Sequence, residues 1–398
     1  MKALIMGGGI AGTSTALALH KAGIESEIFE ARDSHSDGVG AFITLAVNGL
    51  TTLRTLGFDV ASVPGIPTPA MQIAMGDGTQ LAAFPLGPVL EDGTTSRSVR
   101  RTDLYSALRR AAEAAGIPIH YGKRITAAAS TSASVTAAFD DGTTATGDLL
   151  IGADGLHSRT RTIIDPKAPK PRYLGVLNAG GYAHGVPVET AGTMHMMFGS
   201  KTFFSWVGDG AGEVWWFANP PQAREPERGE LSGISAEEWR GTLLDLVEGD
   251  VSPARQIIDA SDELFAPWPT HDFPSVPVWH RDRMIIIGDA AHAASPSSGQ
   301  GASMAIEDAA VLALALRDAP GVDEAFAEFE RIRRPRVTRI VKQGKRNGSG
   351  KTPGKFGRGM RDFFIRRFFA KPPKNQDAQG WMYRYPIDWE KGVLGSGR

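Results

Sequence analysis

The hydrophobic pattern of the first thirty residues predicts a strand, a helix and a second strand. Residues 3–6 form a short apolar run that suits a buried parallel strand, and residues 11–22 carry the small and apolar residues of a packed helix. Residues 25–30, with the sequence ESEIFE, fit a second strand. Because a strand, a helix and a strand in succession are typical of parallel sheets, this part of the chain is expected to form an α/β domain.

Helical and strand patterns alternate further along the chain. Apolar periodicity and glycine stop signals predict helices at about 46–56, 103–115, 235–248, 299–317 and 323–346. Short β segments are predicted between residues 118 and 151, where an Asp-Gly pair marks a hairpin turn at 140–143. Residues 283–287 form another apolar run of the kind found in buried strands.

The composition changes near Pro166. From there to about residue 280, turn residues separate segments rich in aromatic and methionine side chains, such as GTMHMMFG and EVWWFANP. This pattern predicts a mostly antiparallel sheet in a second domain. Within it, residues 262–280 are expected to form a proline-rich connection, and a Gly/Lys/Arg-rich tail ends the chain.

The overall composition limits the class of protein. The chain has 398 residues, enough for two or three domains, and its net charge of −1 offers no field that would attract nucleic acid or an anionic membrane. It contains no cysteine, which excludes disulfides, thiolate nucleophiles, iron–sulfur clusters and Cys-ligated zinc, and we assign no metal ligands. Its apolar runs are too short for a signal peptide or a membrane span, so a soluble, cytoplasmic protein is expected.

A glycine-rich motif lies between the first predicted strand and helix. Gly7-Gly8-Gly9-Ile10-Ala11-Gly12 satisfies G-x-G-x-x-G, in which glycines let the backbone approach a pyrophosphate and the helix N-terminus offers free N–H groups. Glu30 lies 18 residues beyond Gly12, near the spacing of an acid that binds a ribose hydroxyl. The motif alone could be a glycine-rich turn without a ligand. In this setting it predicts dinucleotide binding, without deciding between NAD and FAD.

Two later segments place polar residues after buried strands. Residues 149–161 (LLIGADGLHSRTR) contain Asp154-Gly155, and residues 284–308 contain Gly288-Asp289 followed by a helix that opens at Gly299-Gln300-Gly301. Asp289 could accept hydrogen bonds from a polyol chain. The helix opening directs N–H groups and a partial positive charge toward an oxyanion, such as the N1/C2 carbonyl edge of a reduced flavin.

In combination and in this order, the three segments resemble those of the group A flavoprotein monooxygenases, the para-hydroxybenzoate hydroxylase-like family, over roughly residues 1–345. The resemblance implies non-covalent FAD and a helix start at Arg101 that contacts it. The FAD-binding residues that it implies are Gly7, Gly9, Ile10, Ala11, Gly12, Glu30, Ala31, Arg32, Gly40, Arg101, Asp154, Gly155, Asp289, Pro296, Gly299 and Gly301. One departure is Ser303, where many members carry Asn.

The resemblance and the element pattern together predict an α/β fold with three parts. The Rossmann-like FAD-binding domain, built on a parallel sheet, is discontinuous and comprises residues 1–69, 101–165 and 281–345. An interleaved substrate-binding domain with a mostly antiparallel sheet comprises residues 70–100 and 166–280. Residues 346–398 form a C-terminal helix and tail.

The function implied by the resemblance is hydroxylation. NAD(P)H, a transient co-substrate, reduces FAD, and O₂ then forms a flavin C4a-hydroperoxide that oxygenates an aromatic or polycyclic substrate. Two roles stay open: catabolic hydroxylation of a small phenolic acid, and tailoring or inactivation of a larger natural product such as an antibiotic. The Trp- and Met-rich second domain favours the larger substrate. The sequence has no second G-x-G-x-x-G for the nicotinamide nucleotide, as expected for this family. Alternatives are another flavoenzyme of the same fold, either a geranylgeranyl reductase-like saturase or a halogenase, and a non-catalytic flavin-bound module. The Trp-x-Trp-x-Ile-Pro signature of halogenases is absent.

Candidate substrate contacts come from the aromatic and methionine residues of the second domain. They are Met196, Phe198, Phe204, Trp206, Trp215 and Phe217, although any one of them could instead belong to the core under the sheet. Since the flavin carries the chemistry, no catalytic residue is assigned; His195 and Tyr182 are candidates that could polarise or deprotonate a phenol. The expected partners are a small aromatic molecule and O₂, without nucleic acid, in a monomer or homodimer.

Residues 331–371 are basic, and the simplest interpretation is a solvated helix face. Membrane association is not expected, but an amphipathic anchor is the alternative because four phenylalanines lie among the arginines: Phe363, Phe364, Phe368 and Phe369.

Overall fold

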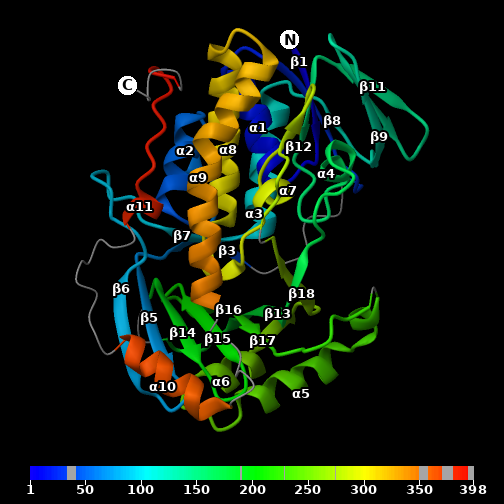
Figure 1. The fold of residues 1–398 in the computed structure, drawn as a ribbon. Coiled ribbons are helices and arrows are strands. Elements are labelled where there is room, and N and C mark those ends of the chain that lie inside the picture. Colours follow the sequence, from blue (N-terminus) through cyan, green and yellow to red (C-terminus); the bar gives the residue numbers. More distant parts are fainter. Residues whose placement is uncertain are drawn as a thin grey trace.

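A six-stranded sheet forms one half of the molecule (Figure 1). The computed structural model describes residues 1–33, 42–188, 191–227, 229–273, 275–348, 357–369 and 380–392. The sheet has the order β19-β20-β12-β1-β2-β8, and its strands are parallel except β19. Their bounds are β1 Lys2–Met6, β2 Glu25–Phe29, β8 Ile119–His120, β12 Leu149–Gly152, β19 His280–Arg281 and β20 Met284–Ile286. The predicted parallel sheet is therefore present.

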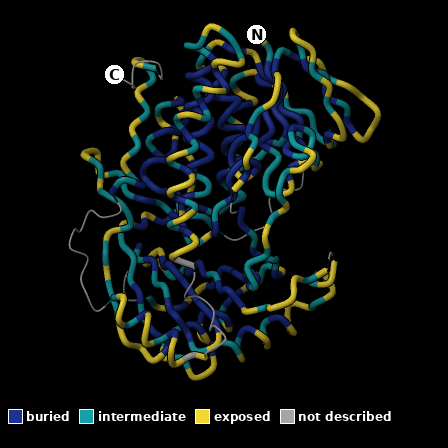
Figure 2. Tube along the Cα trace, viewed as in Figure 1, coloured by how far each residue is buried: buried dark blue, intermediate teal, exposed yellow. Residues whose placement is uncertain are grey.

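Helices pack against this sheet and against one another. The contacts run from α1 to α3 and α8, and from α8 to α2 and α9. Residues 303–316 of α8 are all buried, so this alanine-rich helix lies at the centre of the core (Figure 2). The bounds are α1 Ile10–Lys21, α2 Val47–Thr55, α3 Arg101–Ala114, α8 Gly301–Asp318 and α9 Val322–Gly348. Each of these five helices lies within a few residues of its predicted position.

Smaller elements connect these parts. A three-stranded antiparallel sheet contains the predicted hairpin, with its turn at 140–143: β9 Ile125–Ser130, β10 Val135–Phe139 and β11 Thr144–Gly147. A second one has the order β3-β7-β4: β3 Phe42–Leu45, β4 Gly65–Pro67 and β7 Arg97–Arg100. The short helical segments are η1 Val60–Ser62, α4 Arg159–Ile164, η2 Glu230–Gly233, α7 Asp289–His292 and η3 Pro296–Ser298.

The other half of the molecule is an eight-stranded sheet. Its main path is β17-β13-β16-β15-β14-β5-β6, with β18 paired to β13. All neighbouring strands are antiparallel except β14 and β5. The bounds are β5 Ala70–Met75, β6 Gln80–Pro85, β13 Arg172–His184, β14 Thr193–Phe198, β15 Phe203–Gly208, β16 Glu213–Asn219, β17 Ser261–Leu264 and β18 Trp268–Asp272. The predicted fold class is confirmed, while the exact domain boundaries stay a prediction.

The expected proline-rich connection at 262–280 is wrong in part, because β17 and β18 lie within it or overlap it. The prolines conceal β18 in the sequence, since Pro269 lies in the strand opposite Leu177 of β13. Proline cannot donate a ladder hydrogen bond and is tolerated where only one side of a strand is paired, as in β18.

Four further helices lie within the described residues. α5 (Ala236–Val247) and α6 (Ala254–Asp259) cover one face of the eight-stranded sheet, and α10 (Arg358–Phe369) lies against β6. The segment that begins with α11 (Gly380–Tyr383) returns to the main core, near α2 and α9 (Figure 1). Among the residues placed by the structure, no helix is both long and apolar enough to cross a bilayer.

Candidate cofactor and substrate site

The glycine motif forms a turn that has no room for side chains. Gly7 has φ +107°, and a Cβ there would lie 2.5 Å from the carbonyl oxygen of Ala153. A Cβ on Gly12 would lie 1.8 Å from the carbonyl oxygen of Gly7. The end of β1, the start of α1 and the end of β12 therefore meet in van der Waals contact, the packing that a dinucleotide turn requires.

Glu30 is held against this turn. Its Oε2 accepts a hydrogen bond from the Gly8 backbone N–H at 2.7 Å, and its Oε1 accepts one from the Arg32 N–H at 2.9 Å. Glu30 is half-buried. Because each carboxylate oxygen has a second lone pair, the side chain is fixed in place and can still accept hydrogen bonds from a diol.

Arg101 and Asp289 provide opposite charges beside the turn. Arg101 opens α3 and donates from Nη2 to the Tyr105 hydroxyl at 3.0 Å. Burial alone would lower the pKa of Arg101, but Tyr105 and the negative charge of Asp289 raise it above its ordinary value. Asp289 follows Gly288, where a Cβ would lie 3.2 Å from the Cβ of Ala11. The β20–α7 turn thus lies against the beginning of α1.

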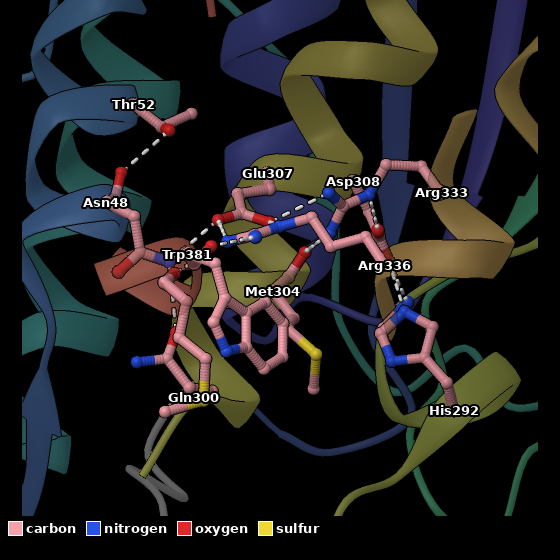
Figure 3. A network of polar contacts seen from close by, with 12 residues as sticks. Asn48, Thr52, His292, Gln300, Met304, Glu307, Asp308, Arg333, Arg336 and Trp381 are labelled. Carbon is pink, nitrogen blue, oxygen red and sulfur yellow. Dashed lines mark hydrogen bonds and ion pairs between the residues drawn. The ribbon is translucent and has the colours of Figure 1, made fainter. Parts of the chain in front are cut away.

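A buried network fixes the β20–α7 turn (Figure 3). The Oδ2 of Asp308 on α8 accepts a hydrogen bond from the Gly288 N–H at 2.9 Å and lies 2.5 Å from His292 Nε2. Its Oδ1 accepts from Arg333 Nε at 2.7 Å. Burial alone would raise the pKa of Asp308, but His292 and Arg333 lower it to about 2. Asp308 is therefore ionised at neutral pH.

The same network reaches the start of α8 through Glu307. Arg336 donates to both carboxylate oxygens of Glu307, and Arg333 Nη1 lies 2.8 Å from Oε2. Asn48 Nδ2 on α2 donates to Glu307 Oε1 at 2.7 Å and to Gln300 Oε1 at 3.0 Å. Gln300 lies between the two glycines predicted to face the flavin ring. One cluster of side chains thus positions both predicted flavin-binding turns.

The Asp154-Gly155 segment is also tied to this region. Asp154 accepts hydrogen bonds from Ser158 Oγ at 2.5 Å and from the Thr160 N–H at 2.9 Å, which fixes the start of α4. Arg161 Nη1 then donates to the Ala290 carbonyl on α7 at 3.0 Å. The Asp154 carboxylate therefore has a structural role, and the contact with α7 is made by Arg161.

The eight-stranded sheet presents different residues on its two faces because side chains alternate along each strand. The face beneath α5 and α6 carries Met197, Phe204, Trp206, Val214, Trp216 and Ala218. The opposite face carries Tyr182, Met194, Val207 and Trp215, with Met71, Met196 and Phe217 half-buried beside them. The ring of Phe42 on β3 lies 5.7 Å from that of Trp215 and 6.0 Å from that of Phe217. The second face is therefore directed toward the dinucleotide half of the molecule.

Arg100 joins this aromatic face to the cofactor site. It ends β7, and its guanidinium carbon lies 4.2 Å from the centre of the Tyr182 ring while the group pairs with Glu213. The next residue is Arg101. One step along the backbone thus separates a residue on the aromatic face from one beside Asp289.

Comparison with known proteins decides the family. The family model of the FAD binding domain matches residues 1–344. The chain belongs to the class A FAD-dependent monooxygenases. An FAD-dependent urate hydroxylase of Klebsiella pneumoniae is 31% identical over 358 residues, which cover 87% of this monooxygenase and 89% of the relative. The aurachin C monooxygenase/isomerase of Stigmatella aurantiaca is 30% identical over 348 residues, covering 87% and 88% of the two chains.

Solved structures agree with this assignment. The crystal structure of Klebsiella pneumoniae HpxO complexed with FAD and uric acid superposes with a TM-score of 0.84 and 26% identity, covering 99% of this chain and 98% of that one. The cofactor of the monooxygenase is FAD, as the sequence predicts.

The residues of this monooxygenase fit FAD. The glycine turn excludes side chains at Gly7 and Gly12, as described above, whereas a Cβ on Gly299 or Gly301 would meet no other atom within 4 Å. The backbone at the start of α8 is thus open to a bound group, and Glu30 and Asp289 would supply carboxylates for the ribose and the polyol chain of FAD. The bound flavin would supply electron transfer to O₂ and oxygen transfer to a substrate.

Most of the predicted cofactor residues come together in space. Residues 7–12, Glu30 with Ala31 and Arg32, Asp154-Gly155 and Asp289 surround the ends of β1, β2, β12 and β20, while Pro296 opens η3 just before α8. Their contacts with FAD stay predictions. Gly40 lies outside the described residues.

The predicted substrate residues divide between regions. Phe204 and Trp206 lie in the core beneath α5 and α6, where their side chains alternate away from the cofactor half, so we remove them from the proposed pocket. Phe198 shares the other face but packs against Ile365 of α10. Met196, Trp215 and Phe217 retain positions on the face toward the dinucleotide half.

The two catalytic candidates differ as well. His195 stacks on Trp206 with ring centroids 4.8 Å apart, on the face away from the cofactor half, which argues against contact with a substrate. Tyr182 lies on the correct face, but burial raises the pKa of its hydroxyl although Arg100 opposes the shift. Tyr182 is therefore a hydrogen-bonding group rather than a base at neutral pH.

The expectation of a solvated basic face is wrong for part of α9. Arg333 is fully buried and Arg336 nearly so, because their charges pair with Glu307 and Asp308. A signal for this cluster was present in the sequence: two adjacent acids interrupt an otherwise apolar helix, and buried carboxylates need cationic partners. The sequence does not reveal which arginines provide them.

Proposed function

We propose that this monooxygenase uses NAD(P)H and O₂ to hydroxylate a bulky, neutral aromatic molecule. The observation that carries the proposal is the half-buried apolar surface of Met71, Met196 and Phe217 beside Trp215. This surface lies close to the cofactor site, because Arg100 contacts the same face and the next residue, Arg101, lies beside Asp289. The substrate would lie between this surface and the flavin ring. Such a surface excludes water from the reacting atoms.

The charges near this surface favour a neutral substrate. Arg100 is paired with Glu213, so its charge is already compensated and is poorly suited to bind a substrate carboxylate. Tyr182, which stays protonated, could donate a hydrogen bond to a carbonyl or hydroxyl group. Relatives named for urate and aurachin C support an aromatic substrate class. We further propose a role in tailoring or inactivating an aromatic natural product, and a cytoplasmic location where NAD(P)H is available.

The test begins with the absorbance spectrum of the purified protein, followed by anaerobic mixing with NADH or NADPH. Each mixing experiment is done without ligand and with candidate substrates, which are neutral polycyclic phenols, small phenolic acids and uric acid. Flavin reduction is expected to accelerate with a neutral polycyclic compound, and aerobic turnover should place one atom of ¹⁸O₂ in the product.

Other outcomes distinguish the alternatives. Acceleration by phenolic acids or uric acid alone would overturn the proposed substrate class but retain the hydroxylase. Reduction of a substrate double bond without O₂ consumption would indicate a saturase. A flavin that no NAD(P)H and ligand combination reduces would favour a binding module.

A further inference from the structure

The outward side of α10 is unusually apolar. Seven large hydrophobic residues are exposed in the described part of the chain, and four of them lie on this one helix: Met360, Phe363, Phe364 and Phe368. The three phenylalanines follow Met360 at spacings of three, four and eight residues, which places them along one helical stripe. A contiguous exposed stripe of this kind, unlike scattered single residues, marks an interaction surface.

The inward side of α10 is separately anchored. Ile365 packs with Ile73 and Met75 on the eight-stranded sheet. Arg361 Nη2 donates to the Gly199 carbonyl at 2.8 Å, and Arg366 Nη2 lies 2.5 Å from Asp77 Oδ2. The helix is therefore held to the sheet without the exposed phenylalanines, which are left free to contact something else.

The charge of α10 is positive although the whole chain has a net charge of −1. The helix contains four arginines and one acid, Asp362, which pairs with Arg361. Arg367 is exposed within the phenylalanine stripe. The neighbouring sequence adds Lys351, Lys355, Lys371 and Lys374 without a compensating acid between 351 and 361 or between 363 and 374.

We propose that α10 docks this monooxygenase on the surface of an anionic lipid bilayer. Phenylalanines would enter the boundary between head groups and acyl chains while the exposed Arg367 contacts lipid phosphates, as apolar and basic residues do in interfacial helices. A second copy of the chain fits this surface less well, because a two-fold interface would place one cationic stripe against its equal. The sequence alone did not favour membrane association; the exposure of the aromatic stripe does.

The proposal rests on the surface of α10 and holds for any substrate. The test is flotation of the full-length, FAD-loaded protein with vesicles of phosphatidylcholine, with and without phosphatidylglycerol, at low and high salt. Binding is expected only to the anionic vesicles and should weaken with salt. A variant with Phe363→Ser, Phe364→Ser and Phe368→Ser should bind at least about tenfold more weakly, because three apolar side chains are removed from the interface.

Two further variants define the cause. Arg367→Glu should also weaken binding, whereas Val89→Ser with Val251→Ser, which removes exposed apolar residues elsewhere, should leave it unchanged. Thermal unfolding and FAD content of each variant establish that it is folded. Failure of the unmodified protein to float at low salt overturns the proposal, as does equal binding to neutral vesicles. A concentration-dependent dimer that the triple variant abolishes would assign the stripe to a second copy instead.

Discussion

The proposed placement of the flavin depends most directly on Asp289. Its carboxylate follows the sharp turn at Gly288 and attracts Arg101. Replacing Asp289 by Ala is expected to weaken FAD binding about 10- to 100-fold, because a charge-assisted hydrogen bond contributes roughly 1.5–3 kcal/mol. Titration of the apoprotein with FAD, followed by flavin fluorescence, measures this change. Asp323→Ala, an exposed acid on α9, is the control; unchanged affinity in Asp289→Ala would refute the placement.

Ser303 illustrates how one side chain adapts to its neighbour. It is buried, its Oγ accepts from the Ala46 N–H at 3.3 Å, and a Cβ added to Gly49 would lie 2.6 Å from that oxygen. Introducing the Asn that many family members carry is therefore expected to separate α2 from α8 and cost about 1–3 kcal/mol of unfolding free energy. Urea unfolding of the apoprotein tests this, with Ala302→Asn at the less buried neighbouring position as control. An equally stable Ser303→Asn variant would mean that α2 can shift freely.

Side chains on the two faces of the eight-stranded sheet are expected to have different roles, substrate binding on the face toward the cofactor and stability on the other. Phe217→Ala removes a half-buried ring from the face toward the cofactor, so it should raise the KM for the substrate with little loss of stability. Phe204→Ala, on the opposite face, should cost about 3–5 kcal/mol because it leaves a cavity beneath α5 and α6. Thermal unfolding and steady-state kinetics of this pair, done together, check the assignment. A larger KM change in Phe204→Ala would reverse the two faces.

The contact between α8 and α9 should respond to acid through Asp308. The pKa of this carboxyl is about 2 in the folded protein, against an ordinary value of 3.8. Because the folded value is the lower one, the ionised carboxylate stabilises the fold above about pH 4, and this contribution is lost as pH falls toward 2. The difference corresponds to roughly 2 kcal/mol. Asp308→Asn is expected to lower stability at pH 7 and to flatten its decline between pH 4 and 2.

Chemical denaturation across this pH range, with Asp323→Asn as the exposed control, measures the contribution. An unchanged acid profile in Asp308→Asn would show that another group controls the transition.

Local patterns predicted elements better than they predicted contacts between elements. The strand before Gly7, the helix after it and the hairpin at 140–143 follow from short-range periodicity and glycine chemistry, and all are present. The strand β18 was not predicted, because its proline and polar residues carry no strand signal and its pairing with β13 stabilises it. The pairing of Glu307 with Arg333 and Arg336 depends on how two helices cross, which no local pattern records. Which face of the sheet Phe204 or Phe217 lies on also depends on how β15 and β16 pair and on what covers each face, and the sequence records neither.

At the scale of the whole molecule, the C-terminal segment closes over the buried charge network. The Trp381 and Met382 carbonyls accept hydrogen bonds from Arg336, and the centre of the Tyr385 ring lies 4.1 Å from its guanidinium carbon. Tyr385→Ala should therefore lower stability by about 1–2 kcal/mol through the lost cation–π contact. Differential scanning calorimetry tests this against Glu390→Ala, an exposed position in the same segment. Equal melting temperatures for the Tyr385→Ala and Glu390→Ala variants would mean that the contact of the Tyr385 ring with Arg336 does not stabilise the fold.

The interleaving of the two sheets has a consequence for how the chain is made. Met71 of β5 pairs with Met194 of β14, and Leu150 of β12 pairs with Met284 of β20, so each sheet joins segments that leave the ribosome more than a hundred residues apart. The β5–β6 hairpin, with Ile73 and Met75 on one side, must therefore wait unpaired until β14 is synthesised, and such long-range closure is slow. During that interval the nascent chain exposes an apolar strand edge that chaperones would recognise. Cutting the gene once could not yield the two halves as separate proteins, because no single cut divides the segments of one sheet from those of the other.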